Sequence, residues 1–149
     1  MSNLNNYLSV LKEELEQIPE IERVIIGFTT PDKHGLNRWG ANALVSLVLP
    51  ATITVEEFSY NVNLSILVYF FENNPETATT RRLSYIQKIQ DRLCLCFERY
   101  KDNISLELQS IDIKDGIRYM GESDNIINIS NPLHAVSMVY AIRINEMRI

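Results

Sequence analysis

The sequence contains few of the residues that mark unusual protein classes. Its 149 residues include only 2 Cys, 5 Gly and 5 Pro, which excludes a disulfide-stapled scaffold, a collagen-like chain and a Gly- or Pro-rich disordered chain. With 46% apolar and 22% charged residues, the composition is that of an ordinary globular protein. A chain of this length suits one domain with one packed core, and we expect a single domain over residues 1–149.

Long hydrophobic runs are also missing. The longest apolar-rich stretch, Leu64 to Phe71, has eight residues, whereas a helix that spans a bilayer needs about 20. The segment from Met1 to Asn6 has neither a basic region nor a continuous apolar one, so we expect no secretory signal. These absences predict a soluble protein without a membrane partner.

There is no excess of basic charge. The chain carries 14 Lys and Arg against 19 Asp and Glu, a net charge of −5. The field of the whole molecule therefore repels phosphate, which argues against non-specific binding of nucleic acid.

Cys94 and Cys96 are the only cysteines. Residues two apart on a helix point in well-separated directions, so a disulfide between these two is not expected. The Cys-x-Cys spacing also lacks the two-residue spacer of common metal sites. We expect reduced thiols at or near the core, as in a protein made in a cytosol.

Motifs for nucleotide, metal or nucleophilic chemistry are not found. The glycines form no phosphate-binding cluster, because they stand apart at positions 27, 35, 40, 116 and 121. The two histidines, His34 and His134, have no partner at metal-ligand spacing. We expect both at the surface or at a strand edge, and we predict no catalytic residue, no cofactor and no metal.

Pairs of carboxylates are the remaining candidates for catalysis, because glycosidases and two-metal nucleases work with such pairs. We interpret Glu56 and Glu57 as charges that protect a strand edge. The acids of the first helix most simply form a solvated face. The pairs to weigh are Glu13-Glu14-Glu16, Glu20 with Glu22, Glu56-Glu57, and Asp112 with Asp115.

Two helices are predicted from apolar residues spaced three and four apart. The first covers Leu4 to Ile18 and is stopped by Pro19. The second begins at Asn74-Pro75-Glu76, where Asn caps the helix and Pro takes the first turn, and it extends to Tyr100. On this second helix Leu95 falls on the polar side.

Alternating or β-branched segments predict the strands. Those before the second helix are 22–28, 43–49 and 58–71, and a long mobile loop at about 29–42 separates the first two. The second face of the 58–71 strand turns apolar in its far half, which suggests that a helix covers it there. After the second helix, the alternation from Ile104 changes phase at Gln109-Ser110, which indicates a β-bulge. Asp115-Gly116 predicts a turn, residues 117–129 are irregular, and a final strand begins at Val136.

A few side chains are candidates for contact with partners. Arg81 and Arg82 could together hold a partner's carboxylate, or could simply be solvated. Trp and Arg are common at interface hot spots, and Trp39 lies in the long loop beside Arg38. Trp39 could equally fold back onto the sheet. The predicted interface residues are Arg38, Trp39, Arg81, Arg82, Leu95 and Tyr140.

The order of elements resembles that of the tail terminator (tail completion) proteins of long-tailed bacteriophages and of related neck proteins. The resemblance rests on pattern and length over nearly the whole chain, and the family has no invariant catalytic motif. The irregular segment 116–132 departs from the smaller members. The resemblance is carried by the opening helix Leu4–Ile18, the strands Ala43–Leu49 and Phe58–Phe71, the helix Pro75–Tyr100 and the closing strand Met138–Met147.

The resemblance implies an α+β fold, a mainly antiparallel β-sheet with two helices packed on one face. It also implies a structural, non-enzymatic virion protein that forms a hexameric ring on the last layer of the tail tube. Such a ring stops tube polymerisation and offers a surface to the head connector protein. DNA would pass through its lumen without specific binding, and the protein would occupy the host cytoplasm during assembly and the phage neck afterwards.

Other functions remain as alternatives. The protein could be another head–tail joining or neck component. It could be a small hydrolase or nuclease that uses Asp112, Asp115 or the pair Glu56-Glu57. It could also bind a small molecule in an apolar pocket between helix and sheet.

Overall fold

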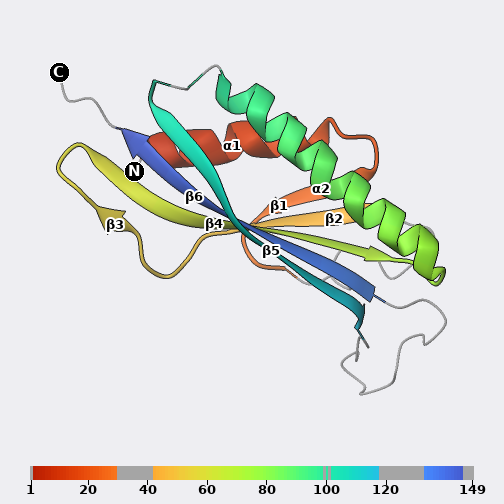
Figure 1. Ribbon diagram of the computed structural model, residues 1–149. Coiled ribbons are helices and arrows are strands. Elements are labelled where there is room, and N and C mark those ends of the chain that lie inside the picture. The colour runs from red at the N-terminus through yellow and green to blue at the C-terminus, as the bar shows by residue number, and fades with distance from the viewer. Residues whose placement is uncertain (1, 30–41, 99, 101, 118–132, 146–149) are drawn as a thin grey trace.

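The protein folds as two helices and a six-stranded sheet (Figure 1). The computed structural model describes residues 2–29, 42–98, 100, 102–117 and 133–145. The elements, in chain order, are α1 (Ser2–Glu16), β1 (Ile21–Ile26), β2 (Ala43–Val48), β3 (Thr54–Val55), β4 (Ser59–Phe71), α2 (Pro75–Glu98), β5 (Ile104–Ile117) and β6 (Leu133–Asn145). The predicted α+β class is confirmed.

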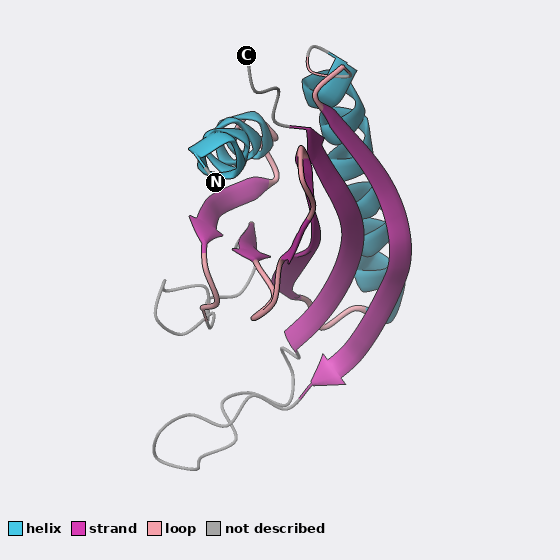
Figure 2. Ribbon diagram, turned by 90° about the vertical axis from the view of Figure 1, so that its left-hand side faces the viewer, coloured by secondary structure: helices cyan, strands magenta, loops and turns pink. Residues whose placement is uncertain are grey.

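The sheet has the strand order β1-β2-β4-β6-β5, with the short β3 paired to β4. All pairings are antiparallel except that of β1 with β2, which is parallel. The sequence predicted a mainly antiparallel sheet but gave no sign of the parallel pair or of β3. In Figure 2, the long strands curve together alongside α2.

The last strand, β6, lies inside the sheet between β4 and β5. Its register with β4 is unbroken from Ser59↔Asn145 to Phe71↔Leu133. A strand that closes the chain can leave an edge available to a neighbour only where it stands at the side of the sheet. Both sides of β6 are paired, so the edges belong to β5 and to β1.

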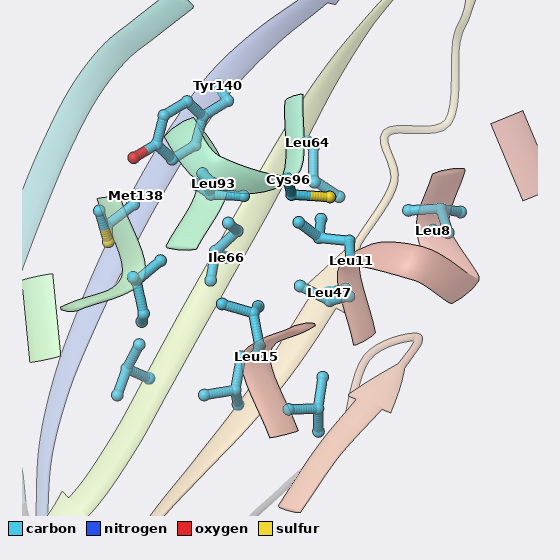
Figure 3. Close-up of a cluster of buried hydrophobic side chains, with 14 of the residues drawn as sticks. Leu8, Leu11, Leu15, Leu47, Leu64, Ile66, Leu93, Cys96, Met138 and Tyr140 are labelled. Atoms are coloured by element: carbon cyan, nitrogen blue, oxygen red, sulfur yellow. The ribbon is translucent and has the colours of Figure 1, made fainter. Parts of the chain in front are cut away.

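Both helices pack on one face of the sheet, where their apolar stripes meet the alternate residues of the strands. Leu11 and Leu15 of α1 and Leu93 of α2 are at most 2% exposed. They converge over Leu64 and Ile66 of β4 (Figure 3). This helix-covered face holds the main core of the protein.

The N-terminus of α2 has the predicted cap. The Asn74 side-chain oxygen accepts hydrogen bonds from the backbone N–H groups of Glu76 at 3.0 Å and Thr77 at 3.2 Å. The cap satisfies two donors that the first helical turn leaves open. It fixes where α2 leaves β4.

The opposite face of the sheet carries no described helix and has a small apolar cluster of its own. Leu44, Phe71 and Leu133 are buried there, with Ile25 and Tyr69 packed against them. The apolar second face of the far half of β4 had been taken to mean a covering helix. This was wrong, because both helices cover the other face and these side chains bury one another.

Strand β5 contains the predicted bulge, since its register to β6 shifts between Leu108 and Ser110. The shift keeps Leu108, Ile111 and Ile113 on the helix-covered face. The turn predicted at Asp115-Gly116 is instead part of β5, which continues to Ile117 with a second irregularity after Lys114.

Candidate functional site

The carboxylates proposed for catalysis are largely engaged in structural contacts. Glu56 accepts hydrogen bonds through Oε2 from Ser59 Oγ at 2.9 Å and from Arg143 Nη2 at 3.1 Å. Its Oε1 accepts one from Asn61 Nδ2 at 3.3 Å. Glu56 thus fastens the β3 turn to β4 and β6, which supports its structural interpretation.

The acids of the first helix are not all on a solvated face, as had been expected. At the end of α1, Arg92 of α2 contacts Glu14 Oε2 at 3.6 Å and donates to Gln17 Oε1 at 3.1 Å. Next to them Lys88 Nζ pairs with Glu20 Oε1. These polar contacts join α1 to α2 along the flank where the helices meet.

Replacing Lys88 by Gln should reduce stability in a pH-dependent way. The hydrogen bond from Lys88 lowers the pKa of Glu20 in the folded protein, and the nearby Lys88 charge adds to this. The contribution of the Lys88–Glu20 pair to the free energy of unfolding is therefore complete above the ordinary glutamate pKa. It is lost as pH falls through the lower pKa that Glu20 has in the folded protein. Because both side chains are 41% exposed, we expect a loss of at most about 1 kcal/mol at pH 7.

Urea denaturation of Lys88→Gln and wild type at pH 7 and at pH 3 measures this difference, which should shrink at the lower pH. The matched control is Lys12→Gln, which removes the same charge from α1 at a residue with no observed ion pair among the described residues. An equal loss at both pH values would contradict the assignment to Glu20.

Arg81 is held inside the chain, which favours a structural role over the capture of a partner's carboxylate. Its Nη1 donates to the Phe71 carbonyl at 3.0 Å, and its Nη2 donates to Tyr85 Oη at 2.7 Å. Its Cζ atom lies 4.8 Å from the centroid of the Phe70 ring. Glu72 Oε1 lies 3.5 Å from Nη1.

Arg82 and His134 are buried, contrary to expectation. Arg82 is 7% exposed and therefore is not a solvated side chain. His134 is 6% exposed, its ring stacks on Phe70 at 5.2 Å, and its Nε2 lies 2.9 Å from the Glu72 carbonyl oxygen. The prediction of a surface or strand-edge histidine is wrong at position 134, where the ring fills the core end of β6 below α2.

The cysteines separate as their spacing predicts, because Cys96 is buried while Cys94 is exposed. The expectation that both lie near the core therefore holds only for Cys96. Tyr140, a predicted interface residue, is 4% exposed and offers no surface to a partner. Burial raises the pKa of Tyr140 to about 12, with the Gln90 side chain acting in the opposite direction.

A hollow of about 550 Å³ lies on the face of the sheet away from the helices. Half-buried Leu67 and Tyr69 line it together with Ala135 and Ser137, and exposed Asp112 and Lys114 of β5 also border it. Burial raises the pKa of the Tyr69 hydroxyl. The hollow thus lies on the face opposite the one where a pocket between helix and sheet was expected, and the side chain of Asp115 lies outside what the structure describes.

Exposed apolar side chains gather at the two edges of the sheet. The β1-edge patch consists of Ile26 of β1 and Phe28, which follows that strand; these residues are 42% and 70% exposed. The β5-edge patch consists of Ile111 and Ile113 of β5, which are 37% and 48% exposed. Leu95, on the outer side of α2 as predicted, is 63% exposed. Such patches are typical of contacts between proteins.

Sequence reasoning missed both patches. Ile111 and Ile113 of β5 are registered with Met138 and Val136 of β6, which are fully buried. The exposed residues therefore lie at the same height along the sheet as buried ones and differ from them in standing on the edge strand. Local alternation carries no signal of which strand forms the edge.

Two predicted interface residues, Arg38 and Trp39, and the loop at about 29–42 lie almost entirely outside the described residues, as does His34. Among the residues that are described, no three or more His, Cys, Asp or Glu side chains gather where a metal ion could bind. No described helix has the length and apolar character needed to cross a membrane. Comparison of the sequence with protein-family models and with curated proteins finds no match.

Proposed function

We propose that this protein is a structural virion protein of the tail terminator kind. Copies of it form a ring that caps a phage tail tube, ends tube polymerisation and joins the tail to the head connector. The observation that carries this proposal is the pair of unlike apolar patches on opposite edges of one sheet. The assignment to a phage tail and the six-fold symmetry come from the resemblance in the order of elements.

Two unlike patches favour a ring over a two-fold dimer. A two-fold contact uses the same surface on both copies, whereas a head-to-tail contact uses two different surfaces. Repeating a head-to-tail contact closes into a ring when the rotation per copy divides a full turn. The β1-edge and β5-edge patches provide the two surfaces that this arrangement requires.

The charge of the chain also suits the role. Six copies at −5 each give a strongly acidic assembly. An acidic ring repels the phosphate backbone, so DNA can move through the lumen without binding to its wall.

Another head–tail joining or neck protein is the closest alternative, and the position of the ring in the particle separates the two. A tail terminator lies against the tube, and a neck component lies next to the portal. The hydrolase or nuclease alternative would require activity from Asp112, Asp115 or the pair Glu56-Glu57, and of these Glu56 already accepts three hydrogen bonds within the chain.

Purified protein should form closed rings, which sedimentation and negative-stain imaging will measure. Rings added to a polymerising tail tube protein should bind tube ends and shorten the tubes. A protein that remains monomeric at all concentrations tested, or one that hydrolyses a substrate through Glu56 or Asp112, would contradict the proposal.

The Leu95→Asp variant tests whether the outer side of α2 takes part. Leu95 is 63% exposed, so the variant should fold with a stability within about 0.5 kcal/mol of wild type. If Leu95 contacts another copy, an added charge there should leave a folded monomer by sedimentation. Leu83→Asp, at the other exposed leucine of α2, is the matched control. Unchanged rings with Leu95→Asp would remove Leu95 from the interface.

A further inference from the structure

The edges of the sheet are formed by β5 on one side and β1 on the other (Figure 1). Among the described residues, β5 pairs only with β6, and β1 pairs only with β2. In a strand at an edge, alternate backbone N–H and C=O groups point away from the sheet. Each edge therefore presents a row of backbone groups that a further strand can pair with.

The directions of the two edge strands suit such pairing. Strand β1 is parallel to β2, and the three steps from β2 through β4 and β6 to β5 are all antiparallel. Three reversals leave β5 running opposite to β1. When the sheet of one copy continues into the next, β1 of the second copy lies antiparallel to β5 of the first.

We infer that β5 of each copy pairs antiparallel with β1 of the next copy, so that one β-sheet runs continuously from subunit to subunit. This deepens the proposed function, because it assigns the contact by which the ring forms and so rests on there being a ring. The occupant of the β5 edge is a second copy of this chain. A different protein on that edge is an outcome of the test.

The apolar residues fix which faces match. Ile26 is registered with Leu47 on the helix-covered face, and Leu108 and Ile111 are registered with Tyr140 and Met138 on that same face. In a continuous sheet the helix-covered faces of the two copies join. Ile26 then packs against Leu108 and Ile111 of its neighbour, which removes exposed apolar surface from water at both edges.

The charges fix the register. On the opposite face β5 carries exposed Asp112, and β1 carries exposed Arg23. Gln109 is the bulged residue of β5 and has no partner of its own in the register with β6. When Ile26 lies opposite Leu108 and Gln109 is skipped in the same way, Arg23 lies opposite Asp112. One alignment therefore satisfies the apolar contact on one face and an acid–base pair on the other.

Charge reversal at this pair tests the contact. In the Arg23→Asp variant every contact sets two acids against each other, and in the Asp112→Arg variant every contact sets two bases against each other. Both residues are exposed, so each variant should fold as wild type does by circular dichroism. Each alone should associate at least about tenfold more weakly than wild type, and sedimentation should show mainly monomer.

An equal mixture of the two variants should restore rings, because every contact between unlike copies then has one acid and one base. The double variant Arg23→Asp/Asp112→Arg should also form rings. As a matched control, Glu107→Arg changes an exposed acid of β5 on the same face, at a position away from Arg23 in this register, and should change association less than Asp112→Arg does.

Disulfide cross-linking between copies measures directly which residues of β1 and β5 lie opposite each other. With Cys94 replaced by Ser, copies carrying Arg23→Cys mixed with copies carrying Asp112→Cys should form a disulfide-linked pair on oxidation. Copies with Arg23→Cys mixed with copies with Ser105→Cys should not. Protomers joined at these positions confirm that a second copy, and not another protein, occupies the edge.

The outcomes separate this inference from the proposed function. Rings of wild type that are unaffected by either charge reversal, or single variants that the mixture fails to rescue, overturn the strand pairing and leave the ring standing. A wild-type protein that binds tube ends only as a monomer overturns both. A β5 edge that cross-links to a tube or connector protein while copies do not cross-link to each other also overturns the pairing.

Discussion

Deleting residues 140–149 should give a polypeptide that does not fold and is recovered in the insoluble fraction. The deletion removes the half of β6 that pairs with residues 59–64 of β4 and residues 104–108 of β5. It also removes Tyr140, Ile142 and Ile144, which are at most 4% exposed. Losing three buried side chains at about 2–5 kcal/mol each costs about 6–15 kcal/mol, which is as large as the roughly 5–15 kcal/mol that stabilises a typical domain.

Expression followed by circular dichroism and hydrogen exchange will measure the outcome. The control is a deletion of residues 146–149 alone, which leaves all of β6 in place. A soluble 1–139 product with a cooperative thermal transition would show that β6 is dispensable in its second half and that its place between two strands has been misjudged.

Replacing Phe70 by Ala should lower the free energy of unfolding by about 3–5 kcal/mol. The Phe70 ring is fully buried and contacts the rings of Tyr85 and His134, each with its centroid 5.2 Å away. The Arg81 guanidinium lies against the same ring. Truncation leaves a cavity and removes the aromatic ring against which the His134 imidazole and the Arg81 guanidinium pack.

Urea denaturation will measure the loss, with Phe58→Ala as the matched control. Phe58 precedes the same strand but is 55% exposed, so its truncation should change stability by no more than about 0.5 kcal/mol. Similar losses for the two variants would mean that the cluster around Phe70 is not the tightly packed end of the core that its contacts indicate.

Local patterns predicted both helices and the long strands, but not the short β3 or the arrangement of the strands in the sheet. The Asn74 cap, the alternation of β4 and the phase change at Gln109 each depend on neighbours within a few residues, and each predicted the structure correctly. Strand order depends on contacts between residues far apart in the chain. The insertion of β6 between β4 and β5 therefore had no local signature.

Polar side chains were the other source of error. His134 is buried and Arg81 is half-buried, although both were expected at the surface because charged and polar side chains usually are exposed. Both lie near the end of β4, where Arg81 Nη1 donates to the Phe71 carbonyl and His134 Nε2 lies 2.9 Å from the Glu72 carbonyl oxygen. A sequence does not reveal that carbonyls at the end of a strand will lie beside these side chains.

The exposed patches at the sheet edges were missed for a related reason. Ile26 and Ile113 have the alternation of core residues, but they stand on the two edge strands, while their partners Leu47 and Val136 are at most 1% exposed. Periodicity shows which face of the sheet a residue occupies. It does not show whether the strand lies at the edge of that sheet.

The interior position of β6 orders events during synthesis. While a ribosome is still making residues 118–132, β4 and β5 both exist but lack the strand that joins them, since their partners in β6 are residues 133–145. Closing the sheet must wait for a segment more than 60 residues downstream of most of β4, which is a slow, non-local step. If copies join through β5 as proposed above, a nascent chain has no finished β5 edge to offer to the nascent chains beside it. The order in which the strands are translated would then keep half-made subunits from joining.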